Sequence, residues 1–254
     1  MLDSQNVQKI QPYQRLAAYY DDLMDYIDYE IWVDDIQKLV KPYQPGKNWL
    51  DISCGTGSMA LIMARRGLQM TAVDLSEHMI QIAREKASEF KLEIDFGIGN
   101  MTEYAPSKEF DVIINLHDGL NYLLEESDIE SFLKNSYKLL KPDGILLFDV
   151  VTPLLCQTHF RGYREIFNDE LGGYERYTNY DPDSQLAESV FTLKTEELDT
   201  VEVESHLQRA YELSDVERFC SNSAFKWWQI LDDETLEKPD ENSERFIVMM
   251  RKAT

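Results

Sequence analysis

The sequence is poor in cysteine and in cationic side chains. Its three cysteines, Cys54, Cys156 and Cys220, lie far apart and lack the paired spacing of a zinc site or a disulfide framework. Only 25 Lys and Arg residues oppose 47 Asp and Glu residues, which gives a net charge of −22. Because affinity for DNA or RNA comes largely from cations that neutralise phosphates, this balance disfavours a nucleic-acid partner. We therefore predict neither a bound metal nor a nucleic-acid partner.

Long apolar runs are also lacking, so we expect no membrane partner. The first residues have neither the basic start nor the apolar core of a secretory signal, which predicts a cytoplasmic protein. Hydrophobic residues make up 43% of the 254, a globular composition. A chain of this length buries about 70 to 75% of its unfolded surface, enough for one large α/β domain with an elaboration. The expected oligomeric state is a monomer or a homodimer.

Residues 49–60, WLDISCGTGSMA, combine the end of a strand, a glycine turn and the start of a helix. Gly55 and Gly57 permit a sharp turn and let a ligand approach the backbone, while the helix start offers unpaired N–H groups. The spacing Gly55-x-Gly57-x-x-Ala60, with Asp74 at the end of the next strand, satisfies a dinucleotide-binding pattern. An NAD-dependent oxidoreductase is therefore one interpretation.

Asp51, near the mouth of this turn, argues against a dinucleotide. A pyrophosphate would lie beside its carboxylate, and two like charges about 4 Å apart at an effective dielectric near 20 repel by roughly 4 kcal/mol. A recognisable hydride-transfer set, such as Ser with Tyr-x-x-x-Lys, is also lacking. These residues favour a positively charged ligand that carries an adenosine, whose ribose hydroxyls Asp74 is placed to bind.

The segment Asp51-Ile-Ser-Cys-Gly-Thr-Gly57 resembles the first motif of class I S-adenosylmethionine-dependent methyltransferases, and Ala72-Val-Asp-Leu-Ser76 resembles the second. Ser53 departs from the pattern, since glycine is more usual there, and we expect slightly altered loop packing with binding retained. The resemblance implies S-adenosyl-L-methionine as cofactor, S-adenosyl-L-homocysteine as product and no metal. It also implies a Rossmann-like, doubly wound, seven-stranded α/β sheet whose last strand is antiparallel.

Hydrophobic periodicity divides the chain into four stretches. We predict N-terminal helices over the cofactor site in residues 1–47, a methyltransferase core in 48–161 and 212–254, and an inserted antiparallel β lid in 162–211 that selects the acceptor. The predicted lid strands are 174–180, 187–195 and 201–211. The predicted core strands begin at Trp49 and then span 69–74, 92–96, 110–115, 145–150, 225–231 and 246–250. Capping boxes at Ser127-x-x-Glu130 and Ser214-x-x-Glu217 mark the starts of two helices, and 141–144 is read as a turn.

The ends of several predicted strands converge on one edge of the sheet, where ligands of open α/β sheets bind. The resemblance implies that Tyr13 and Tyr20 close over the cofactor and that Asn100 replaces an acidic residue which binds the adenine amino group. Met79 either reaches the adenosine or packs in the core. The predicted cofactor-binding residues are Tyr13, Tyr20, Asp51, Ser53, Gly55, Gly57, Asp74, Leu75, Met79, Asn100, Met101, Leu116, His117 and Asp118.

The predicted function is in-line methyl transfer to an O or N nucleophile of a small molecule. His117 is the candidate general base, with cofactor lining as its alternative role, and Asp118 orients it or meets a substrate amine. His206, in the insert, is read as a surface residue, with a reach into the site from the lid as the alternative. The acidic composition, with Asp118, Glu175 and Glu188 in segments expected to face the pocket, predicts a neutral or cationic acceptor. A non-catalytic module that binds S-adenosylmethionine stays open beside these enzymes.

Overall fold

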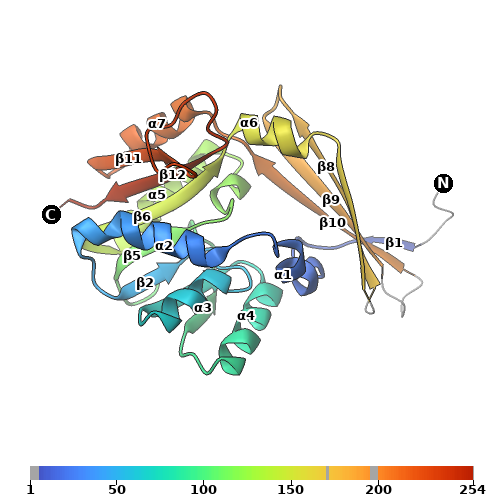
Figure 1. Ribbon diagram of the computed structural model, residues 1–254, viewed down its shortest axis with the longest axis horizontal. Helices are drawn as coiled ribbons and strands as arrows, with labels where there is room; N and C mark the ends of the chain where they lie inside the picture. The colour runs from blue at the N-terminus through green and yellow to red at the C-terminus, as the bar shows by residue number, and fades with distance from the viewer. Residues whose placement is uncertain (1–5, 170–171, 195–199, 254) are drawn as a thin grey trace.

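The computed structural model describes residues 6–169, 172–194 and 200–253, and its larger sheet has seven strands (Figure 1). β12 runs antiparallel to both of its neighbours, and the other neighbouring pairs are parallel. The predicted doubly wound sheet with an antiparallel last strand is therefore confirmed. In spatial order its strands are β11 (Trp227–Asp232), β12 (Arg245–Arg251), β6 (Leu140–Val151), β5 (Phe110–Asn115), β2 (Asn48–Asp51), β3 (Gln69–Asp74) and β4 (Asp95–Ile98).

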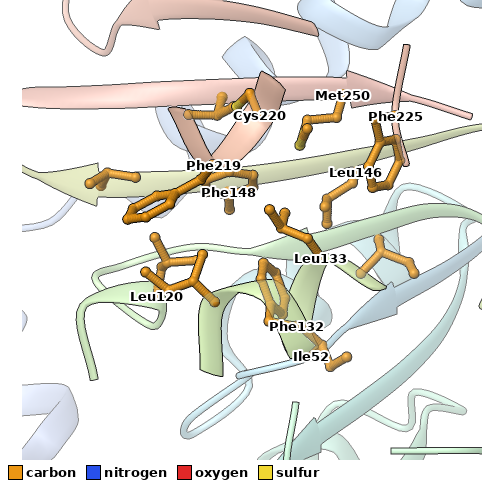
Figure 2. Packing of buried hydrophobic residues seen from close by; sticks show 14 of the residues in the cluster. Ile52, Leu120, Phe132, Leu133, Leu146, Phe148, Phe219, Cys220, Phe225 and Met250 are labelled. Carbon is orange, nitrogen blue, oxygen red and sulfur yellow. The ribbon is translucent and has the colours of Figure 1, made fainter. Parts of the chain in front are cut away.

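Helices cover both faces of this sheet, as a parallel sheet requires. α5 (Glu126–Leu139) and α7 (Leu213–Asn222) bury Phe132 and Phe219 against Phe148 of β6, as Figure 2 shows. α2 (Tyr29–Val40), α3 (Ser58–Arg65) and α4 (Glu77–Glu89) pack on the other face. A fully buried phenylalanine contributes about 1.5 to 3 kcal/mol, so these two cores stabilise the strand ends that carry the site.

A second, five-stranded sheet extends away from the first (Figure 1). Strands β7 (Tyr163–Asp169), β8 (Gly172–Asp181), β9 (Leu186–Lys194) and β10 (Thr200–Arg209) pair antiparallel, which confirms the inserted antiparallel sheet. The prediction missed β7, and it missed β1 (Asn6–Lys9), which pairs parallel with β10. Residue 195 of the predicted second lid strand lies outside the described residues. The two sheets are joined by α6 (Pro153–Leu155) and η4 (Cys156–Phe160).

The remaining short helices lie near the N-terminus and after β5. They are η1 (Leu16–Tyr19), α1 (Tyr20–Leu23), η2 (Lys41–Tyr43) and η3 (Leu120–Tyr122). Within the described part of the chain, no helix is long and apolar enough to cross a membrane.

Local signals explain the differences between predicted and observed boundaries. The predicted capping box at Ser214 is wrong, because Glu212 caps α7 by a reciprocal pair of hydrogen bonds with Asp215. The box at Ser127 is wrong as well, since α5 begins at Glu126 and Ser127 lies in its first turn. The predicted turn at 141–144 is an irregular part of β6, where the pairing register with β5 shifts. The third core strand begins later than predicted, at Asp95.

Candidate active site

A glycine turn joins β2 to α3. Gly55 and Gly57 have φ values of 52° and 80°, in the left-handed region that glycine adopts without strain. A Cβ on Gly57 would also lie 3.0 Å from the Cβ of Ala83 in α4, so α4 could not pack as closely against a bulkier residue. The turn leaves the N-terminus of α3 open beside the carboxyl end of β2.

Two carboxylates flank this turn. Asp51 ends β2 and is 4% exposed. Burial raises the pKa of its carboxyl group to about 7; a hydrogen bond from the Ser53 N–H opposes this rise, and the charge of Asp74 adds to it. The Asp74 carboxylate accepts hydrogen bonds from the N–H groups of Gly55 at 2.8 Å and Ser76 at 2.9 Å. Burial raises the pKa of Asp74 despite these bonds. The turn is therefore an acidic site, suited to a ligand with positive charge and hydroxyl groups.

Three buried polar atoms near the turn have no hydrogen-bond partner among the residues that the structure describes. They are Ser53 Oγ, Asn115 Oδ1 and His117 Nε2. Such an atom costs about 1 to 3 kcal/mol when it is left without a partner, so a polar ligand would relieve the cost. A small pocket by the turn is lined by Asp51, Ser53, Gly55, Leu116, Tyr20 and His117, among others. These residues fit a cofactor with an ammonium group and an adenosine.

A larger cavity of about 500 Å³ adjoins this pocket. Its lining includes Tyr13 from the N-terminal segment, Asp118 from the loop after β5, and Arg176 and His206 from the second sheet. Tyr20 and His117 line both spaces, which places the larger cavity next to the cofactor pocket. A second molecule bound there would lie against the cofactor.

The other predicted residues line neither of these two spaces. Gly57 is part of the turn, and the Asp74 carboxylate accepts a hydrogen bond from the Gly55 N–H. Met79 is 2% exposed and packs in the core, and its N–H is capped by Ser76. Leu75 is 71% exposed. The Oδ1 of Asn100, expected to accept from an adenine amino group, already accepts from the N–H and hydroxyl of Thr102, both at 2.9 Å. Met101 is half-buried, and its sulfur lies 3.4 Å from the Asn115 amide nitrogen.

His117 and Asp118 both have positive φ, 60° and 67°, which is uncommon for residues other than glycine. The His117 ring packs against Tyr29 and Trp32, with ring centroids 4.9 and 4.5 Å away. Burial, with the charge of Arg245, lowers the pKa of His117 to about 4. The imidazole is therefore neutral near pH 7 and offers an unpaired nitrogen to the site.

An ion cluster supports this strained loop. Arg245 of β12 pairs with Asp118 and with the fully buried Asp149, and it lies 3.5 Å from Asp233. The Asp118 N–H also donates to Asp149, at 3.1 Å. Burial opposes the charge on Arg245, but the carboxylates of Asp118 and Asp149 outweigh it and raise its pKa.

The second sheet places polar residues at the cavity, among them His206, for which a reach from the lid was the alternative interpretation. His206 is 3% exposed, so its interpretation as a surface residue is wrong, and the buried face of β10 also carries Glu204. Glu175 and Glu188, expected to face the pocket, are exposed and outside the cavity lining, whereas Glu165 lines it. Strand alternation alone places Glu204 and His206 on the same face of the strand. It does not tell which of the two faces is buried, because the strand carries many polar residues.

Comparison with known proteins agrees with this geometry. Residues 50–144 match the family model described as a methyltransferase domain. A putative methyltransferase from Geobacillus sp. (strain WCH70) is 36% identical over 249 residues, which are 94% of this chain and 99% of that protein. A ubiquinone biosynthesis O-methyltransferase from Pelagibacter ubique (strain HTCC1062) is 35% identical over 107 residues, 42% of each chain.

A solved structure supports the fold over nearly the whole chain. A crystal structure of an S-adenosylmethionine-dependent methyltransferase from Clostridium acetobutylicum ATCC 824 superimposes with a TM-score of 0.80 at 23% identity, covering 95% of this chain and 99% of that one. The acidic glycine turn, the sheet order and these similarities lead to one conclusion: the chain belongs to the class I S-adenosylmethionine-dependent methyltransferases.

Proposed function

We propose that this methyltransferase methylates a hydroxyl or amine of a small molecule that binds in the 500 Å³ cavity. The observation that carries the proposal is that Tyr20 and His117 line both this cavity and the pocket at the glycine turn. A nucleophile in the cavity would then face the methyl donor directly. The name of the Pelagibacter relative, a ubiquinone biosynthesis O-methyltransferase, supports a small-molecule acceptor.

The residues around the turn would hold the cofactor. Asp51 would face its ammonium, Asp74 its ribose hydroxyls, and Ser53 and His117 would use their unpaired atoms as partners. When bound, the cofactor supplies a methyl group activated by a positively charged sulfur. The protein's part is to align the acceptor and to exclude water, which lowers the barrier mainly by orientation. The second sheet serves as the lid that selects the acceptor.

The general-base role of His117 stays a prediction. Its low pKa keeps the ring unprotonated near pH 7, so Nε2 can accept a hydrogen bond or a proton, but a conjugate acid of pKa about 4 holds a transferred proton weakly. Contact with the cofactor or acceptor is therefore the role that the geometry favours for His117. A cytoplasmic location and a monomeric or homodimeric state also stay predictions.

Calorimetry tests the ligand assignment. We expect S-adenosylhomocysteine to bind more tightly than NAD, because the pyrophosphate would meet the Asp51 carboxylate while the aminoacid end would gain from it. Tighter binding of NAD would contradict the proposal. Incubation with methyl-labelled S-adenosylmethionine and a small-metabolite extract then separates an enzyme, which labels a metabolite, from a module that only binds the cofactor.

Asp74→Ala should weaken S-adenosylhomocysteine binding about 10- to 100-fold. The variant removes a charged hydrogen-bond acceptor for the ribose, a contribution of about 1.5 to 3 kcal/mol, and it frees the N–H groups of Gly55 and Ser76. The matched control is Asp95→Ala, which removes a carboxylate from the edge strand β4 where it pairs with Lys108. An unchanged dissociation constant in Asp74→Ala would remove Asp74 from the cofactor site.

A further inference from the structure

A chain of hydrogen bonds crosses from the second sheet to the wall of the acceptor cavity. We propose that Glu204, His206, Tyr122 and Tyr13 form a relay that takes up the proton of the acceptor's hydroxyl or amine. The relay rests on the proposed function and names the group that receives the proton. Its steps are Glu204 Oε2 to His206 Nε2 at 3.2 Å, His206 Nδ1 to Tyr122 Oη at 3.0 Å, and Tyr122 Oη to Tyr13 Oη at 2.5 Å.

Glu204 anchors the chain as a buried carboxylate. It is 0% exposed and accepts hydrogen bonds from the N–H groups of Tyr13, Arg15 and Leu16 at 2.7, 2.6 and 2.9 Å. Burial raises the pKa of Glu204, but the hydrogen bonds from His206, Leu16 and Arg15 outweigh it and hold the pKa below its usual value. Glu204 is therefore ionised at neutral pH and can only accept hydrogen bonds.

The ionised carboxylate sets the tautomer of His206. Because Glu204 can only accept, Nε2 of His206 carries a hydrogen, and Nδ1 of the neutral ring is then an acceptor. Tyr122 must donate its hydroxyl hydrogen to Nδ1, so the Tyr122 oxygen can accept from Tyr13. Every hydrogen of the chain then points toward Glu204.

The cavity end of the chain offers only lone pairs. Tyr13, Tyr122 and His206 all line the 500 Å³ cavity. With both hydroxyl hydrogens donated inward, the free lone pairs of the two phenolic oxygens can accept a hydrogen from a bound hydroxyl or amine. Burial raises the pKa of Tyr13 and of Tyr122, so both phenols stay protonated and pass a proton on without ionising at rest. The chain is therefore suited to a methyl acceptor whose hydroxyl or amine donates a hydrogen bond.

Proton uptake balances methyl transfer. The acceptor's O or N atom gains a bond to the methyl carbon as the carbon–sulfur bond breaks and sulfur keeps the electron pair. The acceptor's proton passes to the Tyr13 oxygen, the Tyr13 hydrogen passes to the Tyr122 oxygen and the Tyr122 hydrogen passes to His206 Nδ1, so that each phenol ends with one hydrogen. The resulting imidazolium is paired with Glu204. Tyr13 and Tyr122 would act as catalytic residues, whereas His206 and Glu204 act through them as positioning residues.

Aromatic rings surround His206, and charged groups lie on the strands beyond it. The ring contacts Tyr13 and Phe191, with centroids 4.5 and 5.2 Å away. Arg176 of β8 is separated from His206 by β9. It lies over the Phe191 ring and donates a hydrogen bond to Ser189, the residue opposite His206 in β9. Glu165 of β7 pairs loosely with Arg176, at 3.9 Å.

Nuclear magnetic resonance tests the relay without an acceptor. In protein with ¹⁵N-labelled histidine and saturating S-adenosylhomocysteine, His206 is assigned by its loss in His206→Gln. We expect the Nε2–H tautomer at pH 7.5 and a shift of the Nδ1 resonance in Tyr122→Phe. An Nδ1–H tautomer, or a resonance that Tyr122→Phe leaves in place, would overturn the relay.

Turnover tests the chemistry with the metabolite fraction that wild-type protein labels. Tyr122→Phe should lower kcat about 10²- to 10⁴-fold with the dissociation constant of S-adenosylhomocysteine unchanged within threefold. His206→Gln should also lower kcat, because the Tyr122 hydroxyl then loses the imidazole nitrogen that accepts its hydrogen. Tyr177→Phe, on the exposed face of β8, is the control that keeps wild-type turnover.

The outcomes separate the two proposals. If S-adenosylhomocysteine does not bind, or if wild-type protein labels no metabolite, the proposed function fails and the relay fails with it. If wild-type protein labels a metabolite and Tyr122→Phe does so at the same rate, the relay alone is overturned.

Discussion

Asp51→Asn should weaken S-adenosylhomocysteine binding about 10- to 100-fold and make the free protein more stable. The two effects have one origin. Asp51 is 4% exposed at the end of β2, where burial raises its pKa to about 7. A carboxylate held there without a cation is costly, and a bound ammonium relieves that cost.

The stability effect follows from the direction of the pKa shift. The pKa of Asp51 is higher in the folded protein than the 3.8 expected for the unfolded chain. Its stabilising contribution is therefore complete below the unfolded pKa and is lost as pH rises through about 7. The full difference corresponds to about 4 kcal/mol, and we expect Asp51→Asn to recover about 1 to 3 kcal/mol of it at pH 8.

The pH dependence of binding distinguishes charge from shape. In the wild-type protein the dissociation constant should rise about tenfold between pH 8 and pH 6, because Asp51 must lose its proton before it can pair with the ammonium. In Asp51→Asn the dissociation constant should stay flat over this range. Titration calorimetry at pH 6, 7 and 8, with thermal unfolding of the free protein, measures both effects.

Asp95→Asn, at the exposed edge strand β4, provides the control for removing one negative charge. It should leave the dissociation constant and the unfolding temperature nearly unchanged. A destabilised Asp51→Asn protein would show that the buried carboxylate does not destabilise the free protein. Binding with wild-type affinity and pH dependence would show that Asp51 does not face the cofactor.

The central fold could be predicted because its signals are local. Strands 69–74 and 110–115 have the predicted boundaries, because each is a mostly buried apolar run that ends at a polar residue before a loop. β1 could not be predicted in this way. It is a four-residue strand held by pairing with β10, about 190 residues further along the chain, and a pairing so distant in sequence leaves no local pattern.

The predicted site was more complete near the glycine turn than in the second sheet. Asp51 ends a strand, and Ser53 and Gly55 follow it in a recognisable motif. The structure places all three in one pocket. Glu204 and His206 lie on a strand where apolar residues alternate with polar ones, and the usual rule turns the polar side to solvent. Here the polar side is buried, because it faces a cavity and Glu204 binds three backbone N–H groups. A buried polar face of this kind departs from the pattern that strand predictions rely on.

Arg245→Met should destabilise the protein by about 3 to 5 kcal/mol, because the variant leaves the carboxylate of Asp149 buried without its cation. The loss also reaches the site. Positive φ at His117 and Asp118 costs about 1 to 3 kcal/mol each, and the bonds from Asp118 to Arg245 and Asp149 offset that cost. Without Arg245 we expect the His117–Asp118 loop to relax and turnover to fall.

Urea unfolding over a range of pH measures this prediction and tests its cause. In Arg245→Met the pKa of Asp149 rises further above its unfolded value, because burial is no longer opposed by a cation. Its stabilising contribution is then present in acid and lost as pH rises, so the deficit should widen between pH 5 and pH 8. Arg251→Met is the matched control, since Arg251 lies on the same strand and pairs with the exposed Asp143, and it should cost less than about 1 kcal/mol. Two outcomes would contradict the prediction: equal losses of stability in the two variants, or a deficit that narrows as pH rises. Either would mean that Arg245 does not stabilise the protein by pairing with the buried Asp149 carboxylate.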